Sequence, residues 1–196
     1  MRRNQKTGYR IMKKTAVIFP GIGYHTEKPL LYYAKKLAKQ SGYEITEVPY
    51  RDLFRDAKEP YKRLEAAFVS AFAQTEEILK AVSFAEDGDL LFISKSIGTV
   101  VASAYAEKYG LNPRHILYTP VKTTFSFHPR EGIAFHGTAD PMADTEMVNR
   151  ACRECRIPLY LTENGNHSLE TGNVQKDLEN LGIIMRQTEA YIRQEF

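Results

Sequence analysis

The chain has 196 residues, of which 43% are apolar and 26% are charged, a composition that fits one globular domain and excludes a disordered or fibrous protein. Its formal net charge is +3, but the first fourteen residues hold six basic side chains and no acid, so residues 15–196 carry a net charge of −3. Such a domain offers no basic surface for nucleic acid, and its two cysteines exclude a disulfide-rich scaffold.

Residues 1–14, which hold these six basic side chains, are expected to form a flexible extension ahead of the fold. The apolar stretch that follows ends at Pro20 and is too short for the core of a secretory signal or for a membrane-spanning helix. We therefore expect a cytoplasmic protein that binds neither membranes nor nucleic acid.

Six short apolar segments are typical of strands that are covered on both faces. In chain order they span residues 15–20, 44–49, 89–93, 115–119, 132–136 and 158–162. Helical periodicity occurs around residues 30–38, 64–82, 97–109, 147–151 and 174–192. The alternation predicts an α/β fold with a single doubly wound parallel sheet of about six strands, in one domain spanning residues 15–196.

In a parallel sheet, ligands bind beyond the carboxyl ends of the strands. Gly21-Ile22-Gly23 follows the first predicted strand, and Ser96 follows the third. Asp140 follows the fifth, and His167 follows the sixth. A serine, an aspartate and a histidine therefore lie after three strands whose ends converge in space.

Residues 94–98 (Ser-Lys-Ser-Ile-Gly) have the pattern of a nucleophile elbow. This is a strained strand-to-helix turn with small residues two positions on either side of the nucleophile. Ser94 and Gly98 are the small residues around Ser96, whereas a motif centred on Ser94 would place Phe92 at a small position. Taken alone, Ser96 is equally compatible with an N-cap of the following helix.

The order of the three polar residues favours a catalytic triad over unrelated roles. Asp140 precedes Pro141 and alone could cap a helix, and a single loop histidine is usually incidental. Together, Ser96, Asp140 and His167 follow the order nucleophile, acid, histidine.

The chain resembles small, uncapped α/β-hydrolases, similar to dienelactone-hydrolase-like and esterase-like members. The resemblance covers about residues 15–196 and is carried by residues 20–23, 94–98, 136–141 and 165–168. Pro20 stands where many members have histidine, and Ser94 stands where the elbow has glycine. The resemblance implies an α/β-hydrolase fold that lacks the family's N-terminal antiparallel strands and its cap.

The resemblance also implies a serine hydrolase of the esterase or thioesterase type that acts on a small or exposed acyl ester, without a cofactor or metal. Ser96 would be the nucleophile, His167 the base, and Asp140 the acid that orients the imidazole. The backbone N–H groups of Ile22 and Ile97 would form the oxyanion hole. A non-enzymatic or acyl-binding protein with the same fold is the alternative, and neither the substrate nor the oligomeric state is predicted.

Further residues near the strand ends are candidates to line the substrate pocket. They are Gly21, Gly23, Tyr24, His25, Lys95, Phe125 and Phe127. The last two lie in residues 120–131, a connection too short for a helical cap. We therefore expect an open site that prefers short acyl groups.

Two other patterns suggest different functions. Gly21-Ile22-Gly23 with Glu47 resembles a dinucleotide-binding turn, but Thr26 stands where the third glycine is needed. Cys152 and Cys155 have the spacing of a redox pair, but they lie near the end of a predicted helix, where the helix dipole opposes a thiolate. We therefore expect structural thiols.

Overall fold

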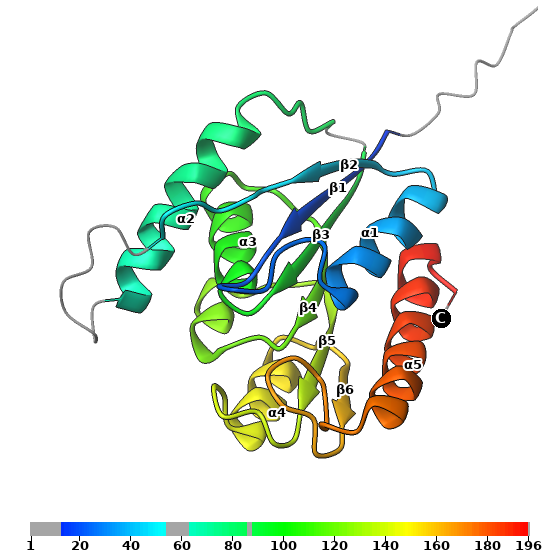
Figure 1. Ribbon diagram of the computed structural model, residues 1–196. Coiled ribbons are helices and arrows are strands. Elements are labelled where there is room, and N and C mark those ends of the chain that lie inside the picture. The colour runs from blue at the N-terminus through cyan, green and yellow to red at the C-terminus, as the bar shows by residue number, and fades with distance from the viewer. Residues whose placement is uncertain (1–12, 54–62, 86–87, 196) are drawn as a thin grey trace, which may run out of the picture.

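The computed structural model describes residues 13–53, 63–85 and 88–195, and Figure 1 shows helices on both faces of a central sheet. The strands are β1 (Lys14–Phe19), β2 (Glu44–Glu47), β3 (Asp89–Lys95), β4 (Arg114–Tyr118), β5 (Gly132–Gly137) and β6 (Leu159–Thr162). All pair in parallel, in the order β2-β1-β3-β4-β5-β6. This confirms the predicted single doubly wound sheet, and each strand boundary lies within two residues of its prediction.

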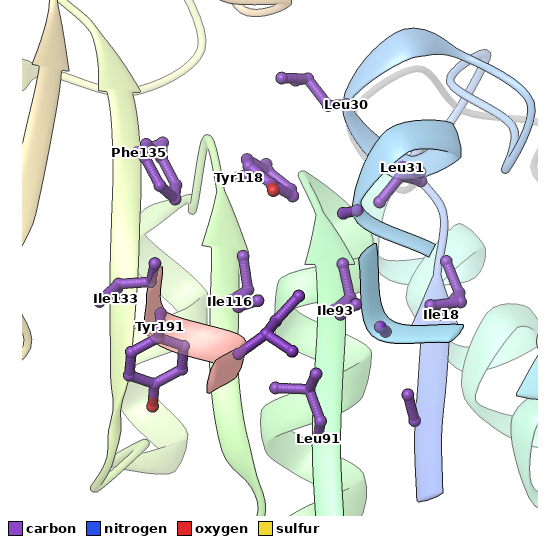
Figure 2. Packing of buried hydrophobic residues seen from close by; sticks show 14 of the residues in the cluster. Ile18, Leu30, Leu31, Leu91, Ile93, Ile116, Tyr118, Ile133, Phe135 and Tyr191 are labelled. Carbon is purple, nitrogen blue, oxygen red and sulfur yellow. The ribbon is translucent and has the colours of Figure 1, made fainter. Parts of the chain in front are cut away.

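The helices divide between the two faces because side chains alternate along each strand. On one face, α1 (Pro29–Gln40) and α5 (Val174–Arg193) cover Ile93 and its neighbours. On the other face, α2 (Arg63–Leu79) and α3 (Ile97–Lys108) cover Phe92, and α4 (Thr145–Glu154) covers Leu117. Figure 2 shows Ile93, Ile116 and Ile133 in register on adjacent strands of the first face.

Between β4 and β5 the chain forms only η2 (Lys122–Phe127), a short 3-10 helix. No cap domain is inserted at this connection, as its length predicted. The strand β1 begins at Lys14, one residue before the predicted domain boundary. Residues 1–12 of the predicted extension lie outside the described residues. Among the described helices, none combines the length and apolar character needed to cross a bilayer.

A buried arginine joins the amino ends of β3 and β4 to α5. Arg114 is only 8% exposed, and its guanidinium lies 3.1 Å from Asp89 Oδ1. It donates to the carbonyl oxygens of Tyr191 at 2.7 Å and Ile192 at 3.3 Å, and it also contacts the hydroxyl of Tyr43. Asp89 also accepts the Tyr43 hydroxyl, but because its carboxylate is shielded from water, it depends on the guanidinium for its counter-charge.

Replacing Arg114 by methionine is expected to lower the free energy of unfolding by about 3–5 kcal/mol, since the buried Asp89 carboxylate loses its counter-charge. Urea denaturation measures this change. The control is Arg193→Met, which removes an exposed pair with Glu189 on α5 and should cost about 1 kcal/mol or less. Equal losses in the two variants would contradict a stabilising role for the Arg114 network.

Candidate active site

Ser96 lies at the turn between β3 and α3, with φ 56° and ψ −123°, a strained conformation for a residue with a side chain. The turn packs tightly against β1, since a Cβ at Gly98 would lie 2.4 Å from the carbonyl oxygen of Phe19. The buried hydroxyl of Ser94 donates to the Ile116 carbonyl at 3.2 Å. Residues 94–98 thus have the geometry of an elbow, with Ser96 at its centre.

His167, in the loop after β6, brings Ser96 and Asp140 together. Its Nε2 lies 2.8 Å from Ser96 Oγ, and its Nδ1 lies 2.8 Å from Asp140 Oδ2. The Asp140 side chain is fully buried, and its other oxygen accepts the N–H of Met142 at 2.8 Å. With Nδ1 donating to the carboxylate, Nε2 is free to accept a proton from the serine.

The loops that carry Asp140 and His167 are bonded directly to each other. The N–H of Ala139 donates to the Gly165 carbonyl at 3.0 Å. A Cβ at Gly137 would lie 2.1 Å from the same carbonyl oxygen, so only glycine permits this approach. The distance between the carboxylate and the imidazole is therefore set by backbone contacts as well as by the side chains.

A second histidine lies behind Asp140. His136 is buried on β5, with Nδ1 3.8 Å from Asp140 Oδ2 and Nε2 3.2 Å from Thr145 Oγ1. Burial lowers the pKa of His136, against the opposing effect of the Asp140 charge. An uncharged ring at this position fills the space behind Asp140 without competing with His167 as a counter-ion.

Residues 21–24 form a tight turn beside Ser96. Gly21 and Tyr24 exchange backbone hydrogen bonds of 3.0 and 3.3 Å, which places Ile22 at the tip. A Cβ at Gly21 would lie 3.2 Å from Ser96 Cβ, so the turn packs against the serine. Ile97 begins α3, and within the described residues neither the Ile22 N–H nor the Ile97 N–H has a protein acceptor. Both are available to a ligand.

No family model and no curated protein matches the chain, but solved structures do. It is similar to a lidless α/β serine hydrolase from Xanthomonas campestris, with TM-score 0.63 and 14% identity over 93% of this chain and 85% of that chain. It is also similar to Est1E from Butyrivibrio proteoclasticus with ferulic acid bound, with TM-score 0.69 and 9% identity over 93% of this chain and 89% of that chain. It is similar as well to mouse alpha/beta hydrolase domain-containing protein 10, with TM-score 0.63 and 10% identity over 93% of this chain and 90% of that chain.

This protein has the α/β-hydrolase fold. It is a small version of that fold, with six parallel strands and no cap between β4 and β5. The elbow, the acid turn and the histidine loop follow β3, β5 and β6 of this hydrolase fold, which are the strands that the sequence predicted.

Three predicted pocket residues have other contacts in this hydrolase fold. His25 is exposed, and its Nδ1 accepts the N–H of Glu27, two residues before α1 begins. Phe125 is buried in the core beneath α4, and Phe127 stacks on Phe68 with ring centroids 6.3 Å apart. The reason is that η2 packs against α3 and α4, which turns both aromatic rings toward neighbouring helices.

The residues that suggested a dinucleotide-binding turn and a redox pair have structural roles. Glu47 forms an ion pair with Lys35 at 2.8 Å. Cys152 lies in α4, and Cys155 follows its last turn. Burial raises the pKa of both thiols, that of Cys152 to about 12. Both are therefore protonated at neutral pH, as expected for structural thiols.

Lys95 occupies an unusual position for a charged residue. It directly precedes Ser96 and is only 1% exposed, with Nζ 5.0 Å from the centre of the Tyr24 ring. In the described part of the chain, no carboxylate lies within ion-pair distance of Nζ. Burial lowers the pKa of Lys95 to about 7, although the charge of Asp140 acts in the opposite direction. Lys95 therefore changes its charge near neutral pH.

This lysine acts on the pKa of His167. Burial is the largest cause that lowers the pKa of His167, and the charge of Lys95 is the second. The hydrogen bond to Asp140 and the charge of that carboxylate act in the opposite direction. A proton on Lys95 thus disfavours a proton on His167 and helps to keep the imidazole neutral as the pH falls.

An apolar groove of about 320 Å³ lies between α1 and α5, and residues adjacent to the site, though not Ser96, Asp140 or His167 themselves, line it. Its walls include Tyr24, which contacts Lys95, and Ser168, which follows His167 in the chain. The main apolar residues of its lining are Leu30, Leu169, Leu178, Leu181 and Ile184. The sequence did not reveal this groove because Leu178 fits the buried face of a helix, whereas it is 60% exposed.

Replacing Lys95 by methionine is expected to raise the pKa of His167, because a positive charge that opposes its protonation is removed. Side-chain NMR of the histidines, recorded as a function of pH, measures the midpoint for His167. Lys122→Met, at an exposed position on η2, is the matched control and should leave that midpoint unchanged. A midpoint for Lys95→Met equal to or below that of the unmodified protein would contradict the electrostatic role of Lys95.

Proposed function

We propose that the protein is a serine hydrolase of the esterase or thioesterase type, acting on a small or exposed acyl ester without a cofactor. The observation that carries this proposal is the His167 ring, which lies 2.8 Å from both Ser96 Oγ and Asp140 Oδ2. The N-cap alternative for Ser96 has no support, since its side chain makes no capping hydrogen bond. The similar lidless serine hydrolase and the ferulic-acid-bound Est1E support the same class.

In the proposed reaction, Ser96 Oγ attacks the acyl carbonyl carbon while His167 Nε2 takes the hydroxyl proton. Asp140 accepts the Nδ1 hydrogen bond and stabilises the imidazolium that forms. His167 then gives the proton to the leaving alcohol or thiol as the ester bond breaks, which leaves an acyl group on Ser96. Water, deprotonated by the same imidazole, releases the acid and restores the serine.

The backbone N–H groups of Ile22 and Ile97 would stabilise the oxyanion of both tetrahedral intermediates. The Ile97 N–H lies at the amino end of α3, where the helix dipole also favours negative charge. The turn that holds Ile22 packs against Ser96 through Gly21. These two contacts support Ile22 and Ile97 as the donors.

The groove between α1 and α5 supports a small acyl group as the substrate. Its volume of about 320 Å³ is at the low end of small-molecule sites. Because the connection between β4 and β5 adds no cap, the leaving group is free to extend into solvent. We expect either a short acyl ester or a short acyl group carried on a larger molecule.

Replacing Ser96 by alanine is expected to lower kcat by roughly a million-fold, because the nucleophile of the triad is removed. Turnover of p-nitrophenyl esters and acyl-CoA thioesters measures the loss, and labelling by a fluorophosphonate probe should disappear with it. Circular dichroism establishes that the variant is folded.

Ser94→Ala is the matched control, because the Ser94 hydroxyl is buried and bonded to β4 rather than to His167. This variant should still be labelled at Ser96. If the unmodified, folded protein were neither labelled nor active on any ester or thioester of the panel, the hydrolase proposal would be wrong, and the non-enzymatic alternative would be favoured.

The groove predicts the dependence of rate on acyl length. From acetate to butyrate, kcat/KM should rise by up to about fourfold per methylene, as each one leaves water, and it should level off before long chains. Leu178→Ser should reduce the rate on butyrate roughly fivefold while sparing acetate, whereas Ile183→Ser, exposed on α5 outside the groove, should change neither. An optimum at twelve carbons or more would contradict this assignment of the acyl site.

A further inference from the structure

A second cleft, of about 600 Å³, opens at the amino end of β4. Ser96 lies against the opposite end of that strand, through its bond to the Tyr118 carbonyl. The cleft is walled by the last turns of α3, by residues 110–113 and by residues 127–131. Because the cleft lies at the opposite end of β4 from Ser96, the proposed reaction makes no use of this space.

Two buried polar groups in the lining have no hydrogen-bond partner within the described residues. They are Ser103 Oγ, on α3, and His115 Nδ1, on β4. The two residues are 1% and 2% exposed. Buried polar groups are nearly always paired, because leaving them without a partner costs free energy. Both residues line the same cleft, so a polar group that enters beside them would relieve this cost.

The surroundings of His115 keep its ring uncharged. Burial lowers the pKa of His115 to about 4, and the ring meets Phe92 edge-on with centroids 5.8 Å apart. A neutral imidazole has one donor and one acceptor nitrogen, and the hydroxyl of Ser103 can both donate and accept. The pair therefore suits a hydroxyl or amide group, which also combines both functions.

The rest of the lining favours an uncharged ligand. Its apolar residues are Ala106, Leu111, Pro113, Phe127 and Pro129. The exposed rim holds Arg130 together with Glu107 and Glu131. With one positive and two negative side chains the rim does not attract an anion, and the carboxylates lie in water at the rim rather than beside the apolar lining, where a cation would need a counter-charge.

We propose that this cleft is a second binding site, which takes an uncharged molecule with an aromatic or apolar body and one hydroxyl or amide group. The body lies against Phe127 and Pro113, and the polar group pairs with Ser103 Oγ and His115 Nδ1. The volume is within the usual range for small-molecule sites.

The test uses phenol, which has an aromatic body and one hydroxyl, and toluene, which has the same size without the hydroxyl. Each is titrated into the full chain while the His115 ring nitrogens are followed by ¹⁵N NMR. Phenol is expected to give a saturable shift and to bind roughly tenfold more tightly than toluene, the effect of a hydrogen bond at a buried site.

Ser103→Ala localises the binding. This variant removes a hydroxyl that has no partner in the described structure, so it should fold with an unreduced Tm. It should bind phenol roughly tenfold more weakly and toluene unchanged, whereas Ser126→Ala, exposed on η2 and outside the cleft lining, should bind both probes normally. The proposal is overturned if His115 shows no saturable shift, if a resident water that phenol cannot displace occupies the pair, or if the folded Ser103→Ala variant binds phenol undiminished.

Discussion

The whole site depends on one imidazole that must reach two partners at once. His167 lies 2.8 Å from both Ser96 and Asp140, and the three residues follow three different strands. Their spacing is fixed by close backbone approaches, at Gly98 against the end of β1 and at Gly137 against the histidine loop. A parallel sheet brings the carboxyl ends of its strands to one edge, which is why distant parts of the sequence can meet with this accuracy.

Because side chains alternate along a strand, Ser94 and Lys95, which are neighbours in the elbow, have different surroundings. Ser94 faces α3 and bonds to the backbone of β4, whereas Lys95 faces α1 and contacts the ring of Tyr24. A buried ammonium is costly, and an aromatic face offsets only part of that cost. In this position, however, its charge lowers the pKa of His167. Lys95 thus packs against Tyr24, at the end of the turn of residues 21–24, and lowers the pKa of His167.

The sheet and the positions of the three polar residues could be predicted because their signals are local. Apolar runs mark the strands, and Ser96, Asp140 and His167 each follow a strand within a few residues. The surroundings could not be predicted in the same way. Phe127 stacks on α2 because of how η2 packs, and Leu178 lines a groove because, among the described residues, none covers it at the start of α5. Both positions depend on contacts between segments that are distant in the sequence, and the periodicity of apolar residues gives no information on such contacts.

The central claim is that an acyl group passes through Ser96. The most direct measurement is acid quenching of the protein during turnover of p-nitrophenyl acetate, followed by peptide mapping with tandem mass spectrometry. The account predicts one acetyl group on Ser96, present in the unmodified protein and absent from His167→Ala, which lacks the base. Acetyl found on Lys95, or on Ser96 to the same extent without His167, would contradict it.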